Sequence, residues 1–108
     1  MIYFVDFDGT ICPNSGSPPQ KECIEVLTRL KEGNNQIVIY SCRSNEDCVA
    51  DAIGSTNDMI AYLEMYKVPY DRVEWGKPFF NFYIDDRNIG VPLTKDHSVD
   101  WARIKQLI

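Results

Sequence analysis

The sequence predicts one α/β domain built as an open, three-layer arrangement around a short, mostly parallel sheet. Short apolar runs alternate along the chain with longer segments of helical periodicity, and strands joined through helices pair in parallel. Polar residues also follow three of the expected strands directly. The 108 residues, 44% of them hydrophobic, suffice for one core. Residues 1–108 are therefore expected to form one domain.

The first half of the chain holds two strands and a helix. The continuous apolar run Ile2–Val5 predicts a buried strand, and residues 11–17 form a turn-rich loop. A helix should begin at Ser17–Gln20, with Ser17 as its cap, Pro18 in the first turn and Gln20 completing a capping box. It should end at Gly33, and its apolar face comprises Cys23, Ile24, Val26, Leu27 and Leu30.

The next elements follow the same alternation. Gln36–Tyr40 predicts the second strand, and residues 44–56 read as a loop with a short helical turn around 47–53. A helix over 57–66 should bury Met59, Ile60, Leu63 and Tyr66. The expected later elements are a third strand over 72–75, a fourth over 80–84, and a closing helix over 99–107 that packs Trp101, Ile104 and Leu107.

Composition excludes several classes of function. The excess of acids, 16 Asp and Glu against 11 Lys and Arg, disfavours bulk nucleic-acid binding and anionic membranes. Four cysteines without Cys-x-x-Cys spacing and one histidine, His97, make a structural zinc site a poor interpretation. No apolar run approaches the ~20 residues of a membrane helix, and no signal peptide is evident. We expect a cytoplasmic protein with reduced thiols.

The polar residues at the strand ends carry the functional prediction. In parallel sheets, ligands bind outside the carboxyl ends of the strands, so these residues should converge at one edge. They are Asp6 and Asp8 after the first strand, Ser41 and Arg43 after the second, and Asp85 and Asp86 after the fourth.

Carboxylates gathered in this way suit phosphoryl transfer with a divalent cation. Two like charges about 4 Å apart repel by ~4 kcal/mol at an effective dielectric near 20, so the cluster calls for Mg²⁺, which prefers oxygen ligands. One carboxylate can act as the nucleophile and form an aspartyl phosphate, and a second can act as general acid and base. Asp6 and Asp8, two residues apart at a strand end, can divide these two roles. Asp6, Asp8, Asp85 and Asp86 are the candidate metal residues.

The phosphate needs positive and hydrogen-bonding partners. Gly9 permits a sharp bend that turns backbone amides of the Gly9-Thr10 segment toward a phosphate. Ser41 can donate a hydrogen bond to a phosphoryl oxygen, and Lys77 can supply a positive charge. Arg43 can bind phosphate or pair with a nearby acid, and the two interpretations are about equal.

These motifs resemble the haloacid dehalogenase superfamily. Asp6-Phe7-Asp8-Gly9-Thr10 matches its first signature, the strand ending in Ser41 looks like the second motif, Lys77 like the third and Asp85-Asp86 like the fourth. The resemblance implies a Rossmann-like phosphatase with Asp6 as nucleophile and Asp8 as general acid and base. The short spacings between the motifs leave no room for the cap domain that larger relatives carry, so we expect a capless member. The resemblance also implies Mg²⁺ held by the Asp6 side chain, the Asp8 carbonyl and Asp85, with Asp86 assisting. The segments around 67–78 and 83–87 are similar to small bacterial and phage members, which implies the cytoplasm of a bacterial or phage-infected cell.

Three functions are consistent with these residues. A phosphomonoester hydrolase accounts for every motif, with a small phosphorylated molecule as its partner. A phospho-accepting module resembling response-regulator receivers would use the same aspartate, hydroxyl and lysine, but has no need of Asp8. A non-catalytic protein that binds a phosphorylated ligand is the third. The open site admits a sugar phosphate, a nucleotide or a polynucleotide end, and a second copy could cover it in a homodimer.

Overall fold

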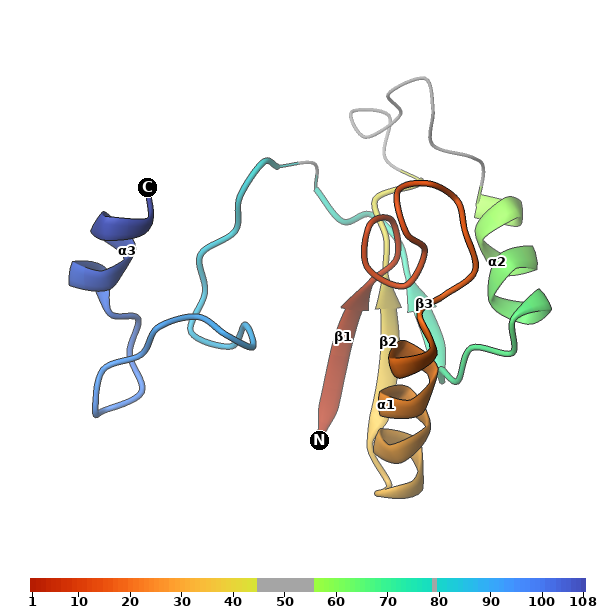
Figure 1. The fold of residues 1–108 in the computed structure, drawn as a ribbon, viewed down its shortest axis with the longest axis horizontal. Helices are drawn as coiled ribbons and strands as arrows, with labels where there is room; N and C mark the ends of the chain where they lie inside the picture. The colour runs from red at the N-terminus through yellow and green to blue at the C-terminus, as the bar shows by residue number, and fades with distance from the viewer. Residues whose placement is uncertain (45–55, 79) are drawn as a thin grey trace.

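The computed structural model describes residues 1–44, 56–78 and 80–108 of the chain. Strands and helices alternate along the described residues, which confirms the predicted α/β class (Figure 1). The helical turn predicted around 47–53 lies outside the described residues. The elements are β1 (Ile2–Asp6), α1 (Lys21–Glu32), β2 (Gln36–Tyr40), α2 (Thr56–Met65), β3 (Arg72–Glu74) and α3 (Trp101–Leu107).

The three strands form one short parallel sheet in the order β1-β2-β3. Residues at the last position of each strand are in register, since Asp6 pairs with Tyr40 and Tyr40 with Glu74. The three strands therefore end at the same level. This confirms the prediction that the residues after β1 and β2 share one edge of the sheet.

The core lies on one face of this sheet. Side chains alternate between faces along a strand, so Ile37 and Ile39 of β2 point to the same side. They join a buried cluster with Leu27 of α1 and with Met59 and Leu63 of α2. Both helices thus contribute to a single apolar layer against one face. The structure establishes a small α/β domain with a short parallel sheet.

The opposite face of the sheet is more open. Ile2 and Phe4 of β1, which alternate with the core positions, are 61% and 53% exposed. The α3 helix lies away from the sheet and contacts none of the other described elements (Figure 1). Among the described residues, no helix packs against this second face, and the three-layer arrangement stays a prediction.

The start of α1 differs from the prediction. The helix begins at Lys21 with Gln20 as its N-cap, and no side chain caps it. Ser17, the predicted cap, instead shares a hydrogen bond with the Ser15 hydroxyl. The two consecutive prolines explain the shift. A residue that precedes a proline is disfavoured in the α conformation, and Pro18 precedes Pro19, so the helix cannot easily begin at Pro18. The predicted end at Gly33 is confirmed, whereas Val26 is 52% exposed and lies outside the core.

The predicted fourth strand is wrong. Residues 80–84 adopt no strand, and β1 remains an edge strand of the described sheet. Aromatic and β-branched content favours a strand only when a neighbouring strand pairs with it, and none does here. The closing helix is confirmed at Trp101–Leu107, where the Asp100 side chain accepts a hydrogen bond from the Arg103 amide. Its packing is not as predicted, because Trp101 and Leu107 are exposed and only Ile104 is buried.

Two further expectations concern thiols and membranes. Cys12 and Cys23 are free, but Cys42 is disulfide-bonded, so the prediction of reduced thiols is wrong for Cys42. The redox compartment determines the ordinary state of a thiol, but it does not determine which sulfurs lie close together in the fold. No helix within residues 1–44, 56–78 and 80–108 is long and apolar enough to cross a bilayer.

Candidate functional site

Asp6, the last residue of β1, has a partner for each carboxylate oxygen. Lys77 Nζ lies 3.1 Å from Oδ1, and the Thr10 hydroxyl donates to Oδ2 at 3.1 Å. The Lys77 side chain is only 18% exposed, and that of Asp6 35%. We call Asp6, Thr10 and Lys77 the Asp6 centre. It combines a half-buried carboxylate, a hydroxyl and a cation at the carboxyl end of the sheet.

Backbone hydrogen bonds bring Lys77 to this edge from far along the chain. The Ser41 amide donates to the Glu74 carbonyl at 3.0 Å, which extends the pairing of β2 and β3 by one step. The Lys77 amide in turn donates to the Ser41 carbonyl at 3.3 Å. The position of Lys77 therefore follows from the parallel pairing of the strands. The structure brings the Lys77 side chain to Asp6, whereas Ser41 meets Lys77 through its backbone carbonyl.

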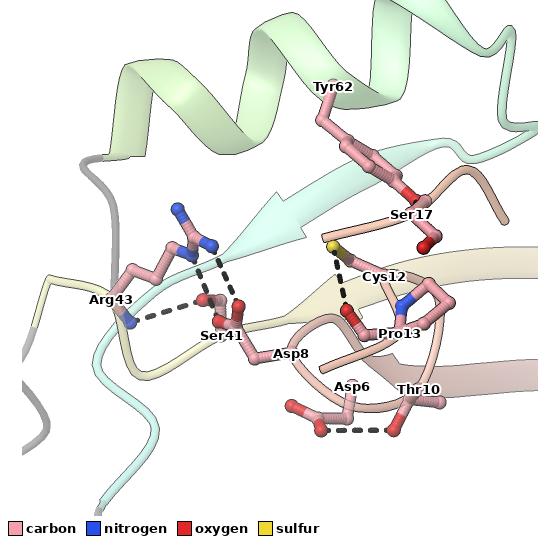
Figure 2. A network of polar contacts seen from close by, with 9 residues as sticks. All are labelled: Asp6, Asp8, Thr10, Cys12, Pro13, Ser17, Ser41, Arg43 and Tyr62. Atoms are coloured by element: carbon pink, nitrogen blue, oxygen red, sulfur yellow. Dashed lines mark hydrogen bonds and ion pairs between the residues drawn. The ribbon is translucent and has the colours of Figure 1, made fainter. Parts of the chain in front are cut away.

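Asp8 has a different cation. Arg43 Nε lies 2.9 Å from Asp8 Oδ2, and a terminal guanidinium nitrogen of Arg43 lies 2.7 Å from Oδ1 (Figure 2). The Ser41 hydroxyl accepts a hydrogen bond from the Arg43 amide at 3.1 Å. We call Asp8, Ser41 and Arg43 the Asp8 centre. Of the two roles predicted for Arg43, the structure shows the pairing with an acid.

Burial strengthens this ion pair. The Arg43 side chain is 9% exposed, that of Asp8 is 32% exposed, and the guanidinium carbon lies 5.0 Å from the centre of the Phe7 ring. Hydrogen bonding to the Asp8 carboxylate raises the pKa of Arg43, although burial acts in the opposite direction. Arg43 is therefore a fixed cation that holds the Asp8 side chain on the side of the site nearest α2 (Figure 2).

Gly9 shapes the turn between the two aspartates. Its φ is +77°, and a Cβ at this position would lie 2.9 Å from Asn14 Oδ1. Only glycine adopts this backbone geometry without strain. The amides of Gly9 and Thr10 donate within the loop, to the Cys12 and Phe7 carbonyls at 2.8 and 3.2 Å. These bonds fix the shape of the turn, and phosphate binding by Gly9 and Thr10 stays a prediction.

The loop that follows is fixed to α2. The Tyr62 hydroxyl donates to the Ser17 carbonyl at 2.6 Å, and its ring packs edge-on against Phe7 with centroids 5.2 Å apart. Burial is the main cause that raises the pKa of Tyr62 above its ordinary value. Tyr62 therefore remains a neutral donor, and it positions the segment between Asp8 and α1 (Figure 2).

The two acids after residue 84 occupy different environments. Asp85 is half-buried and lines the same cavity as Asp6 and Lys77. Asp86 is exposed in a turn and does not line that cavity. The structure thus brings Asp85, but not Asp86, to the cavity that Asp6 also lines.

The donor set bears on the predicted magnesium. In the described part of the chain, no group of three or more Asp, Glu, His or Cys side chains converges closely enough to hold a metal ion. Lys77 and Arg43 already offset the charges of Asp6 and Asp8, which weakens the argument that repulsion alone calls for a cation. Mg²⁺, however, commonly binds through one or two carboxylates together with water and phosphate oxygens. Asp6 and Asp85 line one cavity, and Mg²⁺ binding by these two carboxylates stays a prediction.

Some contacts near the site had weak sequence signals. Tyr40 ends β2 on the same face as Phe4 and Asp6, and Lys77 Nζ lies 5.7 Å from the centre of the Tyr40 ring. The alternation of side chains along β1 and β2 was the available sequence signal for a face shared by Phe4, Asp6 and Tyr40, but no prediction was drawn from it. Phe80 gave no such signal, because it was assigned to a strand that does not form. Its ring centre lies 5.5 Å from the same nitrogen.

Comparison with known proteins gives one informative similarity. No family model matches the chain, and no curated protein matches it. A crystal structure from Vibrio cholerae, described only as a target protein, matches with a TM-score of 0.65 and 31% sequence identity. The match covers 98% of this chain and 94% of the other. With that identity over nearly the full length of both chains, this protein belongs to the same family as the Vibrio cholerae protein.

Proposed function

We propose that this protein is a phosphomonoester hydrolase of the haloacid dehalogenase type, with Asp6 as its nucleophile. The observation that carries the proposal is the Asp6 centre. A carboxylate at the end of a parallel strand has a lysine nitrogen at 3.1 Å, and a second carboxylate, Asp8, lies two residues later. The proposal extends to the finer fold, a capless Rossmann-like domain.

In the first step, an Asp6 carboxylate oxygen attacks phosphorus. The bond between phosphorus and the leaving oxygen breaks, and the aspartyl phosphate forms. Lys77 offsets the charge on the phosphoryl oxygens, and Thr10 holds the second Asp6 oxygen. Mg²⁺ held by Asp6 and Asp85 would add further charge compensation at the phosphate.

Asp8 handles the protons of both steps. As a carboxylic acid it gives its proton to the leaving oxygen, and as a carboxylate it then takes a proton from the attacking water. Water attack on phosphorus releases phosphate and restores Asp6. Both Asp8 oxygens accept hydrogen bonds from Arg43, so Asp8 must leave this pair before it exchanges a proton. Release of Asp8 by Arg43 is therefore part of the proposed cycle.

The ion pair that holds Asp8 against Arg43 also supports a second candidate function. If Arg43 never releases Asp8, no acid is available to activate water, and the aspartyl phosphate persists. The protein would then be a phospho-accepting module resembling a response-regulator receiver. The lifetime of the acyl phosphate after treatment with a small phosphodonor distinguishes the two, because hydrolase turnover leaves little of it.

The test is phosphate release from an aryl phosphate with and without Mg²⁺. We expect activity that requires Mg²⁺, disappears with a chelator, and falls by at least on the order of 10³-fold in Asp6→Asn. Glu22→Gln is the matched control, since it removes one negative charge from an exposed position in the first turn of α1. Undiminished turnover by Asp6→Asn would overturn the mechanism.

A further inference from the structure

A large cavity adjoins the Asp6 centre on the open face of the sheet. It has a volume of about 1310 Å³ and lies between β1 and the chain that follows β3. This exceeds the roughly 300–1,000 Å³ typical of small-molecule sites. Its lining is rich in aromatic rings, contributed by Tyr3, Phe4, Tyr40, Phe80 and Tyr83.

The rings form two pairs on either side of Lys77. Phe4 and Tyr40 meet edge-on with centroids 5.3 Å apart, and Phe80 and Tyr83 lie at 5.3 Å with their planes inclined by 30°. Lys77 Nζ is 5.7 Å from the Tyr40 centroid and 5.5 Å from that of Phe80. Because the same nitrogen lies 3.1 Å from Asp6 Oδ1, the aromatic lining begins directly beside the proposed nucleophile.

These rings are accessible to a ligand. Phe4, Phe80 and Tyr83 are 53%, 40% and 62% exposed, although each apolar ring would be more stable away from water. A flat ring system can stack on these faces, and Arg87 and Asn88, which also line the cavity, can meet its polar edge.

We propose that the leaving group of the substrate carries a flat heterocycle, so that the substrate is a nucleoside monophosphate. This rests on the proposed function of Asp6. The phosphate binds at the Asp6 centre and the base stacks on the rings. Phosphorus bonds to Asp6 as its bond to the nucleoside oxygen breaks, that oxygen takes the proton of Asp8, and water then releases phosphate. The net charge of −5 favours a single nucleotide over a long polynucleotide.

The test compares two substrates that differ only in the base, adenosine 5′-monophosphate and ribose 5-phosphate. Stacking of one base on aromatic side chains contributes ~1–3 kcal/mol, so kcat/KM should favour the nucleotide by about 5- to 150-fold. Equal kcat/KM values for the two substrates would overturn the inference and leave the phosphatase assignment intact.

Two variants in the same segment locate the base. Tyr83→Leu removes a ring from the cavity, and the preference for the nucleotide should fall at least about fivefold. Phe82→Leu is the matched control, because Phe82 is 91% exposed and does not line the cavity. The preference of Phe82→Leu for the nucleotide over ribose 5-phosphate should equal that of the original protein. Equal losses in the two variants would contradict stacking in this cavity.

Binding of adenosine separates this inference from the proposed reaction. Adenosine has no phosphate, so saturation-transfer NMR reports its contact with the rings whether or not turnover occurs. If no ester is hydrolysed but adenosine binds and Tyr83→Leu abolishes binding, the reaction fails and the base site stands. If adenosine does not bind, or if sedimentation shows a dimer from which it is excluded, the base site is wrong.

Discussion

The ion pair between Arg43 and Asp8 should contribute more to stability than any exposed pair of this protein. Arg43→Ala removes two charge-assisted hydrogen bonds, at 2.9 and 2.7 Å, from a side chain that is only 9% exposed. Arg72→Ala is the matched control. Its contact with Glu74 at 3.1 Å joins side chains that are 47% and 46% exposed.

The expected magnitudes follow from burial. A hydrogen bond to a charged group contributes ~1.5–3 kcal/mol, and the loss of one partner from a fully buried pair costs ~3–5 kcal/mol. Water can reach Asp8, which is 32% exposed, so we expect Arg43→Ala to lower the free energy of unfolding by about 2–3 kcal/mol. An exposed pair contributes ~0–1 kcal/mol, which is the limit for Arg72→Ala.

Equilibrium urea unfolding at neutral pH measures both values. A double-mutant cycle with Asp8→Ala then separates the pair from the other contacts of Arg43, including the one with Phe7. We expect a coupling energy of about 1.5–3 kcal/mol. A coupling energy below ~0.5 kcal/mol would refute the reasoning, because the two side chains would then stabilise the fold independently.

Two further predictions concern backbone strain and acid stability. Gly16 has a φ of +77° and open space around it, so Gly16→Ala should lower the free energy of unfolding by ~1–2 kcal/mol. Gly9 has the same φ, but an added Cβ would meet Asn14, so Gly9→Ala should lower it further. If urea unfolding gives equal losses for the two variants, Asn14 moves aside freely and the steric reasoning is wrong. The Lys31 ammonium and then the Ile37 amide lower the pKa of Asp71, so this carboxylate stabilises the fold above its ordinary pKa near 3.8, and that contribution is lost as the pH falls through the lowered value. Asp71→Asn should therefore melt below the original protein at neutral pH, with a gap that closes in acid; a constant gap would exclude linkage to this carboxyl group.

The sequence predicted correctly those features that depend on adjacent residues in the chain and on the geometry of parallel strands. The runs around Phe4 and Val38 are apolar and short, and both form strands. Since parallel strands end together, the placement of Asp6 and Ser41 at one edge of the sheet followed from the order of elements alone. The position of Lys77 agrees because its amide bonds to the strand end at Ser41.

The incorrect predictions depend on contacts that no local pattern contains. Phe80–Ile84 has the composition of a strand, but a strand also needs a free neighbour, and pairing is a property of the whole fold. Helix α1 begins later than predicted, at Lys21, because proline disfavours the α conformation at the residue before it, and this effect exceeds the benefit of a cap at Ser17. The choice of Arg43 between phosphate and Asp8 was undecidable from sequence, since both partners were expected at the same edge.

The central strand β2 has a consequence for how the molecule comes apart. Ile37, Val38 and Ile39 are fully buried, and β2 pairs along both of its edges. Its amides should therefore be the last to exchange with heavy water, whereas α3, which contacts none of the other described helices and strands, should open first. Partial denaturation would then release the distal helix while the carboxyl edge around Ser41 keeps its geometry.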